Sequence, residues 1–191
     1  MPSVDTMFLF IAEGTAVERV DRKGPGGPLA YVWVPDADEA ARVAAEQAAA
    51  GLGLLELYRG FGLAEAGKVI EAVAGRAPVG FAGDLGGVRH PRSITLYGDP
   101  GADPLTETVT VEHPHGARTT VAPAPDDDAM VAAALEAVES GADVVEICGG
   151  TSAATASRVH AAVGDRATVT LVRWPFESIT PAAAYAAAFE S

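Results

Sequence analysis

The chain has 191 residues, enough for one ordinary domain or two very small ones, and 49% of them are apolar, which argues against a disordered chain. Its formal charge of −13, from 26 acidic and 13 basic residues, argues against nucleic acid or an anionic membrane surface as the main partner, because both need positive protein surface. One cysteine excludes an internal disulfide and no apolar run is long enough to cross a bilayer, so we expect a cytoplasmic protein that binds a small molecule or another protein.

The first half of the chain is predicted to form two strands, then a helix, a strand, a second helix and a last strand. Alternating apolar residues bounded by glycine and proline indicate the strands. The first helix has signals at both ends, because Asp36 can cap its free amides, Glu39 has the spacing of a capping box, and Gly51 can end it. The expected elements of residues 1–86 are strands at Met7–Glu13, Leu29–Pro35, Leu54–Tyr58 and Pro78–Gly83, and helices at Asp36–Ala50 and about Leu63–Ala74.

The second half, residues 93–191 after a short linker at 87–92, repeats this order. Pro28–Phe81 aligns with Arg118–Leu171 without a gap, and the matches include prolines, aspartates and glutamates as well as apolar residues. Chance similarity between alanine-rich stretches would not select those residue types. The expected elements are strands at Ser93–Asp99, Ala117–Pro123, Val144–Cys148 and Thr168–Trp174, helices at Asp126–Ser140 and Ala153–Val163, and a short C-terminal helix without a counterpart.

Strands that alternate with helices pair in parallel through crossover connections, so each half should form a small parallel sheet covered by helices. We therefore predict an α/β protein of two pseudo-symmetric ββαβαβ repeats around largely parallel sheets, packed sheet to sheet or closed into a barrel-like core. Ligands bind such sheets at the carboxyl ends of the strands, and the candidate residues are sought there.

Each half carries a glutamate inside its third strand, Glu56 in LLELY and Glu146 in VVEIC. An ionised carboxylate in an apolar strand is costly unless it is paired or used, so its presence in both halves indicates a selected feature. Two interpretations are open. The glutamates are catalytic acids or bases whose pKa is raised by burial, or they belong to a buried hydrogen-bond network without catalysis.

Cys148 ends the third strand of the second half, directly before the glycine turn GGTS. It is either a small buried apolar residue or a thiol activated by the free amides of the next helix, which can also hold a carboxylate or phosphate. In the first half the same place reads YRGFG, so Arg59 can supply a charge instead. The predicted catalytic residues are Glu56, Glu146 and Cys148, and the predicted substrate-binding residues are Tyr58, Arg59, Asp84, Gly149, Gly150, Thr151, Ser152, Arg173 and Trp174.

No cofactor is expected. The weak candidates for metal binding are His113 and His115 in the segment HPH, and two histidines in a loop are more often surface residues. Nothing matches a phosphate-binding loop, a nucleophile elbow or a dinucleotide fingerprint in the right setting.

The second half resembles a family of functionally uncharacterised bacterial proteins about as long as one half of this chain. The resemblance rests on GADP (Gly101–Pro104), EICGG (Glu146–Gly150) and VTLVR, against a family pattern close to GADP, ELCGGFG and VPVGVVRF. The first half keeps RGFG (Arg59–Gly62) and APVGF (Ala77–Phe81), with Tyr58 in place of the cysteine. The resemblance implies a tandem duplication with a shared fold and a pocket in which one copy has specialised. It implies no reaction, because the family has no assigned activity.

These observations favour a small-molecule enzyme of lyase, isomerase or cyclase type that uses buried carboxylates on an anionic metabolite. Glu56 or Glu146 would be the general base, and Arg59 or Arg173 would bind the anionic group. The alternative is a non-catalytic protein of the same fold that binds a small ligand or a protein partner. A homo-oligomer is compatible with both.

Overall fold

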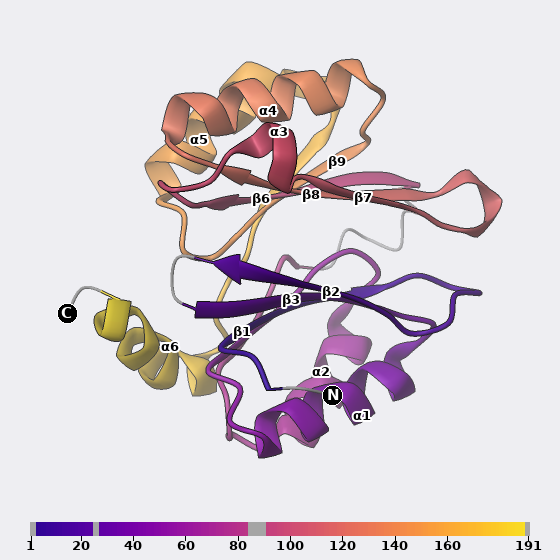
Figure 1. The fold of residues 1–191 in the computed structure, drawn as a ribbon, viewed down its shortest axis with the longest axis vertical. Helices are drawn as coiled ribbons and strands as arrows, with labels where there is room; N and C mark the ends of the chain where they lie inside the picture. The colour runs from indigo at the N-terminus through magenta and orange to yellow at the C-terminus, as the bar shows by residue number, and fades with distance from the viewer. Residues whose placement is uncertain (1–2, 25–26, 84–90, 190–191) are drawn as a thin grey trace. The chain divides into compact units, whose positions relative to one another are not determined.

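The strands and helices form two separate α/β units. The computed structural model describes residues 3–24, 27–83 and 91–189 (Figure 1). One unit lies within residues 1–87 together with 172–191, and the other lies within residues 88–171. The end of the chain therefore folds with the first half, although it follows the second half in sequence.

The first unit contains a five-stranded sheet in the order β2-β3-β1-β4-β5. β1 is parallel to β3 and β4, β4 is parallel to β5, and β2 pairs antiparallel with β3. Figure 1 shows α1 and α2 together on one face of this sheet. The elements are β1 (Thr6–Ile11), β2 (Glu18–Gly24), β3 (Gly27–Val34), α1 (Ala37–Ala49), β4 (Leu54–Leu57), α2 (Leu63–Val73), β5 (Val79–Phe81) and α6 (Phe176–Phe189).

The second unit repeats this arrangement, with a five-stranded sheet in the order β10-β9-β6-β8-β7. β7 is its antiparallel strand, paired with β8, and α4 and α5 lie on one face (Figure 1). The elements are β6 (Arg92–Gly98), α3 (Pro104–Glu107), β7 (Val109–Glu112), β8 (Arg118–Ala124), α4 (Asp127–Glu139), β9 (Val144–Ile147), α5 (Ala153–Val163) and β10 (Thr168–Leu171), with short 3-10 turns at Pro114–Gly116 and Gly164–Arg166.

The first long helix of each unit, α1 and α4, begins in the same way. The Asp36 side chain accepts a hydrogen bond from the Glu39 amide at 2.9 Å, and the Asp126 side chain accepts one from the Ala129 amide at 2.7 Å. Each aspartate therefore satisfies one of the free amides at a helix start, as the sequence predicts. The Glu39 side chain is paired with Arg42.

The predicted α/β class and its two repeats are confirmed. Both sheets are mostly parallel and open, and no closed barrel forms in the described residues. Each sheet has one strand more than predicted, because β2 and β7 lie in segments for which the sequence predicts no strand. The repeating unit is thus a parallel four-stranded sheet with an added antiparallel edge strand.

The two faces of each sheet have different chemistry. In the first sheet alternate side chains such as Leu9 and Val32 pack against α1 and α2. The opposite face carries an aromatic cluster whose ring centroids lie 5.2–6.4 Å apart; its members are Phe8, Phe10, Tyr31, Trp33 and Tyr58. In the second sheet the helix-covered face is also apolar, whereas the opposite face carries buried polar side chains that include Ser93, Thr95, Thr119, Glu146 and Thr170.

The C-terminal segment completes the first unit. Arg173 and Phe81 exchange two backbone hydrogen bonds of 3.0 and 3.1 Å. In α6 the Tyr185 hydroxyl lies 2.6 Å from Thr6 Oγ1, and Ser178 Oγ accepts a hydrogen bond from the Val79 amide. α6 is therefore anchored at the amino ends of β1 and β5. None of the described helices is long and apolar enough to cross a membrane.

Candidate functional site

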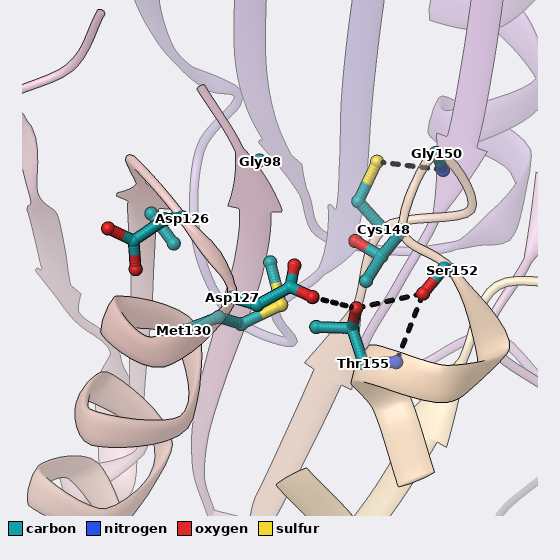
Figure 2. A pocket seen from close by; sticks show the side chains of 10 residues that line it. Gly98, Asp126, Asp127, Met130, Cys148, Gly150, Ser152 and Thr155 are labelled. Atoms are coloured by element: carbon teal, nitrogen blue, oxygen red, sulfur yellow. Dashed lines mark hydrogen bonds between the residues drawn. The ribbon is translucent and has the colours of Figure 1, made fainter. Parts of the chain in front are cut away.

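An open cavity with a volume of about 360 Å³ lies in the second unit, at the carboxyl ends of three parallel strands (Figure 2). β6 and β8 contribute their last residues, Gly98 and Ala124, and Cys148 follows the end of β9. This is the edge at which parallel α/β sheets bind ligands. The remaining lining residues come from the starts of α4 and α5: Asp126, Asp127, Met130, Gly150, Thr151, Ser152 and Thr155.

The half-buried Cys148 thiol lies beside the turn that opens α5. The Gly150 amide donates a hydrogen bond to Sγ over 3.4 Å, and the Thr151 amide donates to the Cys148 carbonyl oxygen over 3.0 Å. A hydrogen bond donated to the sulfur stabilises the thiolate form more than the thiol form. Two of the amides that the sequence analysis assigned to anion binding are therefore used within the turn itself. Gly149, also half-buried, lies in the turn but not among the lining residues.

A chain of hydrogen bonds joins the first turns of α4 and α5 below the cavity (Figure 2). The Thr155 hydroxyl donates to Asp127 Oδ2 over 2.7 Å. Since a hydroxyl has one hydrogen, Ser152 Oγ must be the donor in its 2.8 Å contact with Thr155 Oγ1. Ser152 Oγ in turn accepts from the Thr155 amide over 3.0 Å. The orientation of the Ser152 hydroxyl is thus fixed by Thr155 and Asp127.

The cavity lining is rich in hydrogen-bond acceptors and carries negative charge. Asp126 and Asp127 both line it, and none of its described lining residues is Lys, Arg or His. Arg158 bonds Asp128, and its guanidinium group lies 3.8 Å from Asp127. The hydrogen bond to Asp128 raises the pKa of Arg158, which stays charged. The lining therefore suits a neutral or cationic molecule better than an anion.

Glu146 is buried in the middle of β9, with 1% of its surface exposed. It does not line the cavity, and Cys148 lies two residues further along the chain. The hydroxyl of Thr95, its neighbour on β6, donates to Glu146 Oε2 over 3.5 Å. Glu146 thus lies beside a hydroxyl group on the face of the second sheet that points away from α4 and α5.

Glu56, the counterpart of Glu146, is completely buried on the aromatic face of the first sheet. The Tyr58 hydroxyl donates a short hydrogen bond to Glu56 Oε2. Phe8 and Phe10 pack on the Tyr58 ring, with centroids 5.2 and 5.4 Å away. This arrangement supports the structural interpretation for Glu56, in which a fixed donor compensates a buried carboxyl group.

We expect Tyr58→Phe to lower the free energy of unfolding by about 1–3 kcal/mol, because the variant removes a donor from a buried carboxyl group. Urea unfolding of wild type, Tyr58→Phe, Glu56→Leu and the double variant measures the coupling between the two side chains. The double variant should be more stable than the sum of the single losses predicts. Strictly additive losses would contradict the pairing.

The other predicted binding residues lie in the first unit or outside the described residues. Arg59 follows β4, is half-buried, and accepts a backbone hydrogen bond from Ile11 over 3.0 Å. Arg173 is exposed, and the half-buried Trp174 ring lies against Gly80. Asp84 lies outside the described residues. Arg173 and Trp174 therefore adjoin β5, while Cys148 and its neighbours line the cavity of the second unit.

The place in the first unit that corresponds to the cavity is filled by a side chain. Tyr58 stands at the position of Cys148, and Phe61 stands at the position of Thr151. Phe61 is 5% exposed and belongs to the core cluster packed against α1 and α2. The two copies therefore differ at the strand ends: the first is packed with aromatic rings, and the second is open and polar.

The histidines considered as metal ligands have different surroundings. His113 is buried and its Nε2 lies 3.0 Å from Thr119 Oγ1, whereas His115 is exposed. No group of three His, Cys, Asp or Glu side chains that could hold a metal ion occurs among the residues that the structure describes.

Comparison with protein families matches the chain twice to one family model. The model is the Family of unknown function (DUF6506), and it matches residues 4–84 and 92–187. These two regions correspond to the two α/β repeats of the structure. No curated protein and no solved structure matches the chain. The chain therefore belongs to the DUF6506 family of unknown function, whose model it matches once in each half.

Proposed function

We propose that the second repeat binds a small metabolite in the cavity at the ends of β6, β8 and β9, and that Cys148 is the group that reacts with it. One observation carries the proposal. The single thiol of the chain lies in an open cavity, beside a donor amide and a fixed hydrogen-bond network. A thiolate there takes a proton from the ligand, and the resulting thiol returns it to a neighbouring atom of the ligand, an isomerase-type step without net oxidation.

The ligand of this proposal is neutral or cationic, in contrast to the anionic metabolite expected from the sequence. Asp126 and Asp127 disfavour an anion, and the amides of Gly150 and Thr151 already donate within the turn. Hydroxyl or amine groups on the ligand would find carboxylate and hydroxyl acceptors along this lining. Ser152, whose hydroxyl is oriented by Thr155, would contact the ligand on the side opposite Asp126.

Glu146 supports a second candidate, acid and base chemistry by a buried carboxyl group. It shares the second unit with Cys148, and the neighbouring Thr95 hydroxyl is its hydrogen-bond donor. Glu56 is a weaker candidate because its carboxyl group is bonded to Tyr58. Glu146→Gln tests this candidate, because it should abolish turnover while leaving ligand binding in place.

The first test uses the single cysteine as its own reporter. A ligand identified in a metabolite screen by thermal shift should slow the modification of Cys148 by iodoacetamide, as measured by intact-mass spectrometry. Cys148→Ser should still bind this ligand but lose turnover, because a serine hydroxyl is a far poorer base and nucleophile than a thiolate.

The chain offers a clean control, because no other thiol can be modified. If a ligand stabilises the protein without changing the rate at which iodoacetamide modifies Cys148, the ligand binds elsewhere and the proposal is refuted. Full turnover by Cys148→Ala would refute the role of the thiol and leave Glu146 as the candidate.

A further inference from the structure

The direction of the hydrogen bonds below the cavity determines what Ser152 can offer a ligand. The Thr155 hydroxyl gives its hydrogen to Asp127 Oδ2, so the Ser152 hydroxyl gives its own hydrogen to Thr155 Oγ1. Ser152 Oγ also accepts from the Thr155 amide. A hydroxyl usually either donates or accepts, but toward a ligand Ser152 can here only accept. These three residues, Ser152, Thr155 and Asp127, are called the hydroxyl relay below.

The two carboxylates of the lining add further acceptors. Asp126 uses Oδ1 for the Ala129 amide, and the Thr155 hydroxyl bonds Oδ2 of Asp127. Oδ2 of Asp126 and Oδ1 of Asp127 therefore remain for a ligand. Figure 2 shows Asp127 and Ser152 on opposite sides of Thr155. A ligand in this cavity finds acceptors on both of these sides.

The charge around the cavity amounts to about one negative unit. α4 and α5 both begin at the cavity, and each helix start carries about +0.5 of a charge from its free amides. These two starts together offset about one of the two carboxylates, Asp126 and Asp127. Arg158 is bonded to Asp128, so that these two charges balance each other. A ligand with a single positive charge would neutralise what remains.

The first repeat has neither the open cavity nor the hydroxyl relay. The equivalent positions are held by Ala37, Gly62 and Glu65. In that repeat the Gly62 amide donates to Glu65 Oε2 over 3.1 Å at the start of α2. The fold can therefore begin this helix without the relay, which occurs in the copy that has the cavity.

We propose that the cavity selects a ligand that carries a protonated primary amine, and that Thr155 sets this selectivity by keeping Ser152 a hydrogen-bond acceptor. The inference rests on the function proposed for this cavity, because it names the chemical group that the ligand presents there. A primary ammonium group has three N–H donors and one positive charge, which match both the acceptors and the remaining charge. An alcohol has one donor and no charge, and a quaternary ammonium group has the charge but no donor.

The first test compares four probes with the same butyl chain: butylammonium, 1-butanol, N,N,N-trimethylbutylammonium and butyrate. Ligand-observed NMR titrations at neutral pH give the Kd of each probe. Wild type should bind butylammonium about tenfold more tightly than 1-butanol or the quaternary probe, and butyrate most weakly. Asp127→Asn should remove most of this preference. Asp165→Asn is the matched control, because it removes the same charge from the turn at the other end of α5.

The second test addresses the relay itself with methyl propyl ether, an isomer of 1-butanol that can only accept a hydrogen bond. Wild type should bind the ether more weakly than 1-butanol, because Ser152 has no hydrogen to offer. Thr155→Val releases the Ser152 hydrogen, so the Kd of the ether should approach that of 1-butanol. Thr155→Ser keeps the hydroxyl group and should retain the order of affinities of wild type.

Four results would overturn the proposal. Equal affinity of wild type for butylammonium and 1-butanol, or no measurable binding of butylammonium, would exclude selection of an amine. Equal affinity for the quaternary probe would show that only charge is recognised. Equal losses in Asp127→Asn and Asp165→Asn would exclude a local contact. If Thr155→Val still binds the ether more weakly than 1-butanol, Thr155 does not set the selectivity.

These outcomes are independent of the tests of Cys148. Its alkylation and the turnover of Cys148→Ser are measured with a ligand from the metabolite screen and not with the butyl probes. A reactive Cys148 in a cavity without preference for amines would refute this inference alone. Preference for butylammonium together with full turnover by Cys148→Ala would refute only the role of the thiol.

Discussion

Replacing Gly80 with valine should lower the free energy of unfolding of the first unit by about 3 kcal/mol, the upper end of the usual cost of overpacking. A Cβ atom at this position would lie 2.7 Å from Val172 Cγ1 and 2.8 Å from a Trp174 ring atom. Valine adds two methyl groups to that clash. The segment that contains Val172 and Trp174 would have to move away from β5, to which Arg173 is hydrogen bonded.

Chemical denaturation followed by tryptophan fluorescence measures this effect, and the native spectrum should shift to the red as Trp174 becomes more exposed. Gly67→Ala is the matched control in the same unit. Nothing lies within 4 Å of a Cβ atom at Gly67, which is inside α2, so alanine should stabilise the helix by about 1 kcal/mol. A Gly80→Val protein as stable as wild type would mean that the C-terminal segment does not pack on β5.

The sequence predicts the repeated helices well because their signals are local. Asp36 and Asp126 act as caps in the structure, and the helices after them begin at Ala37 and Asp127. A capping side chain contacts an amide only three residues away, so it does not depend on the rest of the fold.

The edge strand β2 was not predicted because it lacks the apolar alternation of the buried strands, and the edge strand β7 (VTVE) alternates over only four residues. β2 has the sequence ERVDRKG, and none of its residues is fully buried. Charged residues are typical of edge strands, since they discourage pairing with other chains. Such a strand cannot be distinguished from a polar loop by hydrophobic pattern alone.

No local sequence pattern predicts the path of the chain after Leu171. The segment TVTLVRW is continuous in hydrophobic pattern, yet β10 ends at Leu171 and Arg173 pairs with Phe81 in the first unit. This pairing depends on contacts between residues far apart in sequence. Local patterns therefore indicate that a strand is present but not which sheet it joins.

The residues singled out in the sequence coincide in part with the lining of the candidate cavity. The rule that ligands bind at strand ends identified Cys148, Gly150, Thr151 and Ser152, which line the cavity. Asp127 and Thr155 were missed, because their hydrogen bond joins two helices and has no sequence spacing of its own. A comparison of the two repeats could have identified them, because the first repeat has alanine and glutamate at the positions of Asp127 and Thr155.

Changing the side chains that distinguish the two strand ends should lower the stability of the first unit and reduce access to the thiol in the second unit. Phe61→Ala should destabilise the first unit by about 3–5 kcal/mol, because it removes a buried ring from the packed core and leaves a cavity. Thr151→Phe should instead place a ring where the second unit is open. The rate of Cys148 alkylation should fall strongly in this variant, because Thr151 and Cys148 line the same cavity.

Urea unfolding and intact-mass kinetics of iodoacetamide modification measure the two effects. Thr151→Val is the matched control, because it has nearly the same volume as threonine and should leave the thiol accessible. Unchanged alkylation of Thr151→Phe would mean that the ring points away from the cavity. Together the variants test one physical claim. In the first copy the aromatic ring of Phe61 fills the space at the strand ends, and in the second copy the same space is open around the Cys148 thiol.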